Sequence, residues 1–195
     1  MRQLLLATGN AGKVHEIEHA LAGHHWKIIP QSEFGIHDSV EETGVTFVEN
    51  ALIKARHASA ITKLPALADD SGLVVDALNG EPGVYSARYA GENVPYTVHI
   101  TKLLHALTDI PDEKRTARFY CVMVYLTHAN DPTPIICQGT WEGRILHSPQ
   151  GEHGFGYDPV FYVPTHDCSA AELSLSEKNR ISHRGQALAQ LTQKL

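Results

Sequence analysis

Short apolar runs alternate along the chain with longer segments in which apolar residues recur every three or four positions. The first pattern is typical of buried strands, and the second of helices with one buried face. It predicts strands at residues 4–7, 28–29, 65–68, 119–127 and 135–139. It predicts helices at residues 11–22, 47–61, 98–107 and from residue 182 to the C-terminus. With no internal repeat or linker, we expect one α/β domain over residues 1–195.

Composition allows a packed core and argues against two kinds of partner. Hydrophobic residues make up 43% of the 195 residues, and the formal net charge is −6. An acidic chain is a poor match for a nucleic-acid polymer or an anionic membrane, and no apolar run reaches the length of a membrane span. The three cysteines, Cys121, Cys137 and Cys168, are far apart and odd in number. They favour reduced thiols, and therefore a cytoplasmic protein.

A polar segment with two glycines separates the first predicted strand from the first predicted helix. It consists of Thr8, Gly9, Asn10, Ala11, Gly12 and Lys13. Glycines let the backbone approach a ligand, a helix N-terminus attracts anions, and Lys13 adds a positive charge. The pattern favours phosphate binding, although it is not a Walker A loop. The alternative is an ordinary strand-to-helix turn with a surface lysine.

Carboxylates gather at two other places. Asp69 and Asp70 lie in the sequence Asp-Asp-Ser-Gly, which we place in a turn after the strand at 65–68. Two adjacent carboxylates are costly to bury without positive charge nearby, and Mg²⁺ takes one or two carboxylates together with phosphate oxygens. Such a carboxylate also serves to deprotonate water. Glu41 and Glu42 lie in a predicted polar loop at 35–44 and are candidates for a further metal ligand; a solvated turn and a flexible acidic loop are the alternatives.

Three further segments carry polar or aromatic candidates. Asn50 and Lys54 share a helix face, where an exposed polar surface is the commoner explanation. The glycine-rich loop at 151–159 contains Phe155 and Asp158, which suit stacking on a base and hydrogen bonding to its edge; a tight loop with Phe155 in the core explains it equally well. Residues 178–184 collect cations and donors at a helix start, and either an anion site or a solvated helix entry accounts for them.

One motif points elsewhere. The sequence from His15 to His19 matches HExxH, the signature of zinc proteases. A zinc site needs a third ligand, which nothing nearby nominates. The motif also falls on the predicted exposed side of the helix at 11–22. We therefore do not expect a metalloprotease.

Six motifs, in this order, resemble those of the inosine triphosphate pyrophosphatase family over nearly the whole chain. They are TGNxxK at residues 8–13, EETGxTFxENAxxKA at 41–55, DDSGL at 69–73, PGxYSARY at 82–89, GFGYDPxF at 154–161 and SHRGxAL at 182–188. The resemblance implies an elongated mixed β-sheet with flanking helices that form two lobes around a central cleft, usually in a homodimer. It implies Mg²⁺-dependent hydrolysis of ITP, dITP and XTP to the monophosphate and pyrophosphate. A non-catalytic module that binds purine nucleotides is the alternative.

The resemblance also implies a role for each matching residue. Asp70 would bind Mg²⁺ and accept a proton, with Glu41 as a second ligand and Glu42 as its close competitor. Ser71 would touch the substrate. The phosphate contacts would be Thr8, Gly9, Asn10, Ala11, Gly12 and Lys13, together with Lys54 and Arg88. The base contacts would be Phe155, Gly156, Tyr157, Asp158, Lys178, His183 and Arg184.

Overall fold

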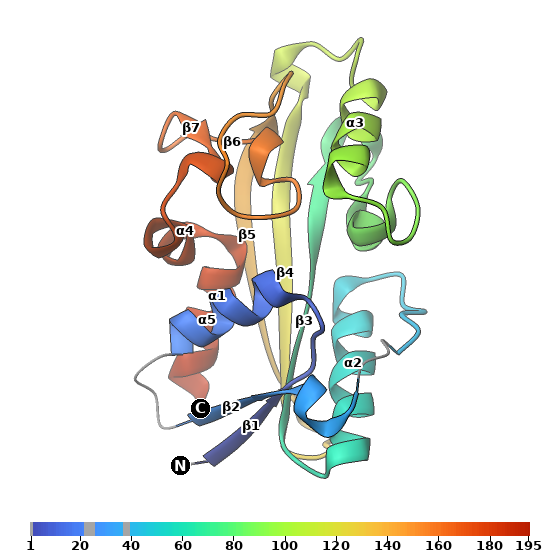
Figure 1. The fold of residues 1–195 in the computed structure, drawn as a ribbon, viewed down its shortest axis with the longest axis vertical. Helices are drawn as coiled ribbons and strands as arrows, with labels where there is room; N and C mark the ends of the chain where they lie inside the picture. Colours follow the sequence, from blue (N-terminus) through green and yellow to red (C-terminus); the bar gives the residue numbers. More distant parts are fainter. Residues whose placement is uncertain (1, 22–25, 37–39) are drawn as a thin grey trace. The chain divides into compact units, whose positions relative to one another are not determined.

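The computed structural model describes residues 2–21, 26–36 and 40–195 (Figure 1). The strands are β1 (Arg2–Leu6), β2 (Trp26–Pro30), β3 (Ala66–Val75), β4 (Thr116–Leu126), β5 (Ile135–Ile145), β6 (Phe161–Val163) and β7 (Cys168–Ser169). The α-helices are α1 (Ala11–Leu21), α2 (Phe47–Thr62), α3 (Tyr96–Ala106), α4 (Leu175–Ile181) and α5 (His183–Lys194). Short 3-10 helices occur in several connections, including η3 (Gly83–Arg88) and η5 (Asp158–Val160).

The strands form one mixed sheet in the order β2-β1-β3-β4-β5-β6-β7. Strand β1 pairs in parallel with β2 on one side and with β3 on the other. Strand β6 pairs antiparallel with both β5 and β7. Helices flank the sheet, so the expected mixed α/β class is confirmed. The lobes and the central cleft implied by the resemblance stay predictions.

The chain divides into two compact units, each built from separate segments. Unit 1 consists of Met1–Asp70, Cys121–Gly139 and Arg184–Leu195, and unit 2 of Ser71–Tyr120 and Thr140–His183. The boundary falls inside β3, β4 and β5. The expectation of a single domain therefore stays a prediction.

Each unit has its own apolar core. In unit 1, Ile17 of α1 and Leu191 of α5 pack with Leu4, Leu67 and other residues of the strands. Helices α1 and α5 lie on one face of this part of the sheet and α2 lies on the other (Figure 1). In unit 2, Leu103 of α3 packs in a cluster with Leu73, Phe119, Trp141, Phe161 and their neighbours.

Helix α2 begins and buries its face as its sequence predicts. The Thr46 side chain accepts a hydrogen bond from the backbone N–H of Glu49, and the Glu49 carboxylate accepts one from the backbone of Thr46. This capping box satisfies N–H groups that have no partner inside the helix. Ala51, Ala55 and Ala58, spaced by three or four residues, are buried. Because their side chains are short, α2 can lie close against the sheet.

The largest correction concerns β3. The predicted strand at 65–68 was expected to end in a turn at Asp69-Asp70-Ser71-Gly72, but β3 runs on to Val75, so both aspartates lie inside the strand. The sequence pattern favoured a turn because adjacent carboxylates, serine and glycine are depleted in buried strands. Side chains from distant segments neutralise the carboxylates and permit the longer strand.

Other expectations differ mainly in length. Strand β5 extends to Ile145, beyond the predicted end at residue 139, and α2 and α3 match their predictions within two residues. The predicted C-terminal helix from residue 182 is α5, and α4 precedes it. The short strands β6 and β7 were not predicted, because two or three residues carry no readable period. The expected end of the first helix at residue 22 and residues 37–39 of the loop at 35–44 lie outside the described residues.

The close pairing of β5 with β6 generates a stability prediction. A methyl group on Gly143 would lie 2.4 Å from the carbonyl oxygen of Tyr162 and 2.6 Å from the Phe161 ring. Gly143→Ala should therefore lower the free energy of unfolding by roughly 1–3 kcal/mol, as overpacking usually does. Urea denaturation measures the loss. Gly9→Ala is the control, since its added methyl would meet only Gln31 Nε2, at 4.0 Å; equal losses in both variants would contradict the prediction.

Candidate functional site

The strand order of unit 1 reverses at β1. From β1 the chain passes through α1 to β2 on one side of the sheet, and β3, which follows α2, pairs with β1 on the other. In open sheets of parallel strands, ligands bind outside the carboxyl ends of the strands at such a switch point. The carboxyl end of β1 leads into residues 8–13, and the neighbouring strand β3 carries Asp69 and Asp70. The topology thus brings two of the predicted site segments together.

The segment at 8–13 is held by its own polar side chains. Thr8 Oγ1 accepts a hydrogen bond from the backbone N–H of Asn10 at 3.2 Å. Asn10 Oδ1 accepts one from the N–H of Lys13 at 3.1 Å, as an N-cap does at the start of α1. The N–H groups of Ala11 and Gly12 belong to the first turn, where a helix has no acceptor of its own. This arrangement suits an anion at the start of α1.

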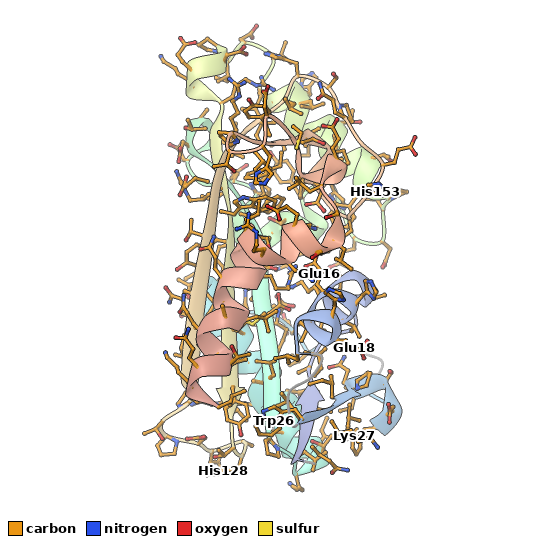
Figure 2. The ribbon with its side chains drawn as sticks, turned by 90° about the vertical axis from the view of Figure 1, so that its left-hand side faces the viewer. Glu16, Glu18, Trp26, Lys27, His128 and His153 are labelled. Atoms are coloured by element: carbon orange, nitrogen blue, oxygen red, sulfur yellow. The ribbon has the colours of Figure 1, made fainter. Side chains whose placement is uncertain are left out.

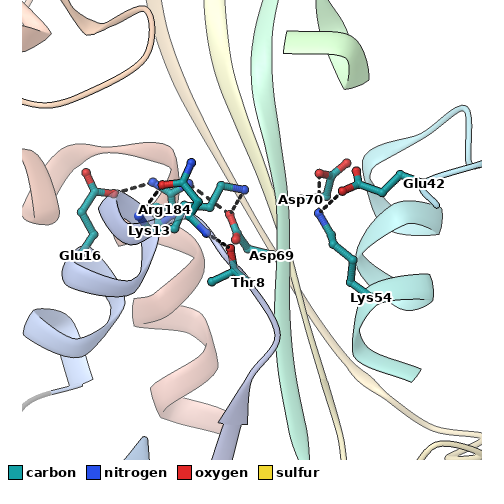
Figure 3. A network of polar contacts seen from close by, with 9 residues as sticks. Thr8, Lys13, Glu16, Glu42, Lys54, Asp69, Asp70 and Arg184 are labelled. Carbon is teal, nitrogen blue, oxygen red and sulfur yellow. Dashed lines mark hydrogen bonds and ion pairs between the residues drawn. The ribbon is translucent and has the colours of Figure 1, made fainter. Parts of the chain in front are cut away.

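Asp69 and Asp70 point to opposite sides of β3 (Figure 3). Successive side chains of a strand alternate between its two faces, so adjacent aspartates in a strand are separated by the backbone itself. Both are buried, at 1% and 5% exposure. Each carboxylate therefore meets a different set of neighbours, and the two form separate polar groups.

Two cations neutralise Asp69. Its Oδ2 atom lies 3.0 Å from Lys13 Nζ and 3.1 Å from Arg184 Nη2. Burial alone would raise the pKa of Asp69, but the charges of Lys13, Arg184 and Lys54 outweigh it and hold the pKa well below its ordinary value. Asp69 is therefore a fixed anion that ties the start of α1 and the start of α5 to β3.

Glu16 completes the charged group around Asp69, and the sequence analysis did not identify it. It accepts a hydrogen bond from Arg184 Nη1, and it is 3% exposed. Glu16 and Glu18 both lie on α1 (Figure 2), but only Glu18 is exposed. The expectation that the HExxH match lies on the exposed side of the helix is thus wrong for its glutamate. The partner, Arg184, is 168 residues away in the sequence, so no local pattern could reveal the pair.

Asp70 faces Lys54 on the other side of β3. Lys54 Nζ lies 2.8 Å from Asp70 Oδ1 and 3.4 Å from Glu42 Oε1. Burial raises the pKa of Asp70, and the charges of Lys54 and Lys13 offset only part of that rise. Burial lowers the pKa of Lys54, but the charges of Asp70, Asp69 and Glu42 outweigh it and raise the pKa above its ordinary value. One lysine thus lies between two carboxylates.

This second group fits a hard divalent cation. Asp70 Oδ2 is buried and lacks a hydrogen-bond partner among the residues that the structure describes. Mg²⁺ needs only one or two protein carboxylates, because water and phosphate oxygens complete its shell. Within the same described residues, no group of three or more His, Cys, Asp or Glu side chains gathers as a metal cage. Of the two loop glutamates, Glu42 approaches Lys54, while Glu41 is exposed.

Asn50 supports the loop that carries Glu42. It is fully buried, which corrects the expectation of an exposed polar face around Asn50 and Lys54. Asn50 Oδ1 accepts a hydrogen bond from the N–H of Gly44 at 2.8 Å. A methyl group on Gly44 would lie 2.7 Å from that oxygen, so glycine is needed for the approach. Asn50 therefore fixes the loop instead of presenting its amide to solvent.

Four of the predicted base contacts gather in unit 2. Asp158 Oδ2 accepts hydrogen bonds from the N–H of Phe155 at 2.8 Å and from Lys178 Nζ at 2.6 Å. Lys178 Nζ also lies 4.7 Å from the centre of the Phe155 ring. The Tyr157 hydroxyl donates to the carbonyl oxygen of Ser86 at 2.9 Å. The hydrogen bond from Phe155 to Asp158 thus closes the glycine-rich loop on itself, and the buried ion pair between Asp158 and Lys178 fixes that loop to α4.

The remaining predicted residues are placed as follows. The His183 ring stacks on Phe119, with ring centres 4.9 Å apart and planes inclined by 14°; the sequence did not point to Phe119. Arg88, at the end of η3, lies 5.0 Å from the centre of the Tyr85 ring. Ser71 directly follows Asp70 in β3 and is half-buried, and Gly156 adopts a positive φ of 68°. The Arg184 guanidinium pairs with Glu16 and Asp69 in unit 1, and its predicted contact with the base stays a prediction.

No helix among the described residues is both long and apolar enough to span a membrane.

Comparisons with known proteins agree over the whole chain. The model of the Ham1 family matches residues 4–194. The dITP/XTP pyrophosphatase of Idiomarina loihiensis is 60% identical over 196 residues, which cover 98% of this chain and 96% of that protein. The dITP/XTP pyrophosphatase of Salmonella typhimurium is 58% identical over 188 residues, covering 96% and 95%. The solved structure of a HAM1 protein from Coxiella burnetii is 54% identical, with a TM-score of 0.92 over 99% of this chain and 98% of that one.

The buried pair of Glu16 and Arg184 generates a prediction. Glu16→Gln removes the negative charge and leaves Arg184 with one anionic partner fewer in a buried position. Breaking such a pair by altering one member should lower the free energy of unfolding by roughly 3 kcal/mol. Glu18→Gln, on the exposed side of the same helix, should change it by no more than about 0.5 kcal/mol. Urea denaturation compares the two, and equal stabilities would refute the structural role given to Glu16.

Proposed function

The chain belongs to the Ham1 family, and on that premise we propose that it hydrolyses non-standard purine nucleoside triphosphates, namely ITP, dITP and XTP, to the monophosphate and pyrophosphate. Relatives named dITP/XTP pyrophosphatase match it at 55–60% identity over nearly its full length. The class of enzyme is therefore a nucleoside-triphosphate pyrophosphatase. Removal of such nucleotides keeps them out of the pool available for nucleic-acid synthesis.

One observation carries the proposal. Within unit 1, the start of α1 follows β1, and Asp70 lies on the adjacent strand β3, at the point where the strand order reverses. The start of α1 suits an anion, and the buried Oδ2 atom of Asp70 has no hydrogen-bond partner among the described residues. Phosphoryl transfer requires mainly the neutralisation of phosphate charge and an aligned nucleophile. The loop at 8–13 supplies positive potential, and Asp70 supplies an acceptor for the proton of water. A module that only binds nucleotides would not need the second of these.

We assign the phosphates to the segment Thr8, Gly9, Asn10, Ala11, Gly12 and Lys13. Backbone N–H groups at the start of α1 donate to phosphate oxygens, and Lys13 adds a charge that Asp69 holds in place. Lys54, Ser71 and Arg88 are assigned as further contacts to the substrate. The charge of Lys54 is shared with Asp70 and Glu42, so it also keeps two carboxylates together before substrate binds.

Asp70 is assigned as general base and as a ligand of Mg²⁺. Its raised pKa makes it a stronger base than a solvated carboxylate, and its buried Oδ2 atom has no hydrogen-bond partner among the described residues. Mg²⁺, when bound, supplies charge neutralisation for the phosphate oxygens. The family resemblance implied Glu41 as the second ligand, with Glu42 as its close competitor; the approach of Glu42 to Lys54 supports Glu42. Both remain proposals for this chain.

The base is assigned to residues of unit 2. Phe155 offers a ring for stacking, the Asp158–Lys178 pair offers both an acceptor and a donor, and His183 is held flat by Phe119. Hypoxanthine and xanthine present a carbonyl at position 6 and an N–H at position 1, which match a donor and an acceptor. Adenine presents the opposite pattern.

A homodimer and a cytoplasmic location are further proposals. The homodimer rests on the family resemblance, and the cytoplasmic location rests on the free cysteines.

The role of Asp70 leads to a test of the whole proposal. The unmodified protein should release pyrophosphate from XTP and dITP when Mg²⁺ is present. Asp70→Asn removes both the base and a metal charge, so turnover should fall by about 10²- to 10⁴-fold. Pyrophosphate release at saturating Mg²⁺ is the measurement, and urea denaturation should show that the variant still folds.

Lys54→Met serves as a matched variant. Lys54 lies on α2 and faces Asp70, so the substitution removes the partner of Asp70 but not the proposed base itself. It should retain more turnover than Asp70→Asn. Turnover near that of the unmodified protein in Asp70→Asn would move the base to another residue. Absence of pyrophosphate release by the unmodified protein would favour the non-catalytic module.

Base choice gives a second test. The amino group of adenine at position 6 would face the protein donor, and its bare nitrogen at position 1 would face the protein acceptor. Each such buried mismatch costs about 1–3 kcal/mol. Two mismatches together should lower kcat/KM for ATP by about 30- to 1000-fold relative to ITP. GTP should lose less, because guanine shares the carbonyl and the N–H. Initial rates over a panel of triphosphates measure this, and equal cleavage of ITP and ATP would remove the base-reading role from unit 2.

The same panel separates the phosphate contacts from the base contacts. Lys13 pairs with Asp69 in unit 1 and should act on the phosphates alone. Lys13→Ala should therefore weaken ITP and GTP by similar factors and leave their ratio unchanged. A change of more than about tenfold in that ratio, equivalent to roughly 1.4 kcal/mol, would show that Lys13 reads the base.

A further inference from the structure

Strand β3 extends well beyond its pairing with β1, so most of the edge that faces away from β4 has no strand beside it. Strand β1 pairs with β3 only at Ala66 and Leu67, whereas β3 continues to Val75. From there on, the backbone groups on that edge need other partners, since a buried peptide N–H is costly to leave without an acceptor. The segment that follows β3 in unit 2 provides them. Val75 N–H donates to the carbonyl oxygen of Glu81 at 3.3 Å, and Val74 forms an isolated bridge with Pro82.

Beyond that bridge, a side chain replaces the missing strand. Ser86 Oγ accepts the N–H of Leu73 at 2.9 Å and donates to the carbonyl oxygen of Gly83 at 2.7 Å. The hydroxyl thus takes the place that a backbone carbonyl of a paired strand would occupy. Ser86 is 7% exposed, so water does not readily substitute for it.

Ser86 also holds the glycine-rich loop. Its carbonyl oxygen accepts the hydroxyl hydrogen of Tyr157 at 2.9 Å. Tyr157 is 2% exposed and packs edge-on against Tyr96 of α3, with ring centres 5.7 Å apart. One residue therefore joins three segments of unit 2: the second half of β3, the 3-10 helix η3 and the loop that contains Asp158.

Each of these segments carries a residue assigned above to the substrate. Leu73 is two residues from Ser71, η3 ends at Arg88, and Tyr157 directly precedes Asp158. We propose that Ser86 is a positioning residue for the part of the substrate site in unit 2: it does not touch the nucleotide, but it fixes η3 on the edge of β3 and so holds Arg88, which is assigned to the triphosphate, at a set place in that unit. This inference rests on the proposed function of the site.

The hydroxyl, and not merely a small buried side chain, is the feature that the proposal requires. Ser86→Ala keeps the backbone carbonyl that Tyr157 uses but removes the acceptor for Leu73 and the donor to Gly83. Ser86→Thr keeps both. The matched control is Ser59→Ala in unit 1, because Ser59 is 1% exposed and its hydroxyl likewise donates to a backbone carbonyl, that of Leu64, at 2.8 Å.

Steady-state kinetics with XTP tests the positioning role. Loss of a positioning contact that acts equally on bound substrate and transition state raises KM and leaves kcat unchanged. Ser86→Ala should raise KM by about 3- to 10-fold, the worth of one hydrogen bond, with kcat changed by less than about twofold. Ser86→Thr and Ser59→Ala should keep the KM of the unmodified protein. A KM in Ser86→Ala equal to that in Ser59→Ala would overturn the proposal.

A double-mutant cycle shows whether Ser86 acts through Arg88. In an Arg88→Ala background the contact to be positioned is gone, so adding Ser86→Ala should raise KM by less than about twofold more. An equal rise in both backgrounds would overturn the link to Arg88. Hydrogen exchange supplies the structural readout: the Leu73 amide should exchange at least about tenfold faster in Ser86→Ala than in Ser59→Ala.

Binding of inorganic triphosphate separates this inference from the proposed function. Calorimetry should show a 3- to 10-fold weaker affinity, roughly one hydrogen bond, in both Ser86→Ala and Arg88→Ala, whether or not the protein turns over XTP. If the unmodified protein releases no pyrophosphate, the proposed function fails and the affinity of this probe still decides the role of Ser86. An affinity of Ser86→Ala for inorganic triphosphate equal to that of the unmodified protein would overturn the positioning role of Ser86.

Discussion

Two adjacent carboxylates can be buried only if each finds its own positive charge, and the site of unit 1 is built around that constraint. The alternation of β3 sends Asp69 and Asp70 to opposite faces. Lys13 and Arg184 reach one from α1 and α5, and Lys54 reaches the other from α2. The helices on both faces of the sheet are therefore fixed to β3 by charge as well as by apolar packing. An uncompensated carboxylate at either position would cost several kcal/mol, which makes the helix positions and the strand mutually dependent.

The parallel strands decide where this charge lies. Because β1 is followed by crossovers to both sides, the start of α1 comes next to the middle of β3. The end of β1 then has two consequences. It puts the start of α1 beyond the carboxyl end of β1, where we propose that the phosphates bind, and it leaves the second half of β3 without a strand on the side of β1, although β4 lies on the other side. The proposed phosphate site and the need for other partners along this edge of β3 thus arise from the same short strand.

The sequence predicted the parts of this structure that depend on local pattern. Helix α2 was predicted with its cap because Thr46 and Glu49 lie three residues apart and the buried alanines repeat along one face. The polar connection from β1 to α1 was predicted because glycine, asparagine and lysine follow a strand, and its binding of an anion stays a prediction. The placement of Asp69 inside β3 was not, because its partners lie at residues 13 and 184. Burial of Glu16 and the stack of Phe119 on His183 were missed for the same reason: each depends on a contact between distant segments.

The two faces of β3 differ in charge, and this difference supports the separate roles proposed for Asp69 and Asp70. On the Asp69 face, two carboxylates meet two cations, so the cluster is balanced before any ligand arrives. On the Asp70 face, one lysine meets two carboxylates, and burial still raises the pKa of Asp70. The balanced face is suited to hold Lys13 rigidly, since its charge is fixed by Asp69. On the Asp70 face the two carboxylates outnumber the one lysine, which is why Mg²⁺ is proposed to bind there. A general base is most useful where its charge is not already neutralised, which supports the proposal that Asp70 acts on the substrate while Asp69 holds Lys13 and Arg184 in place.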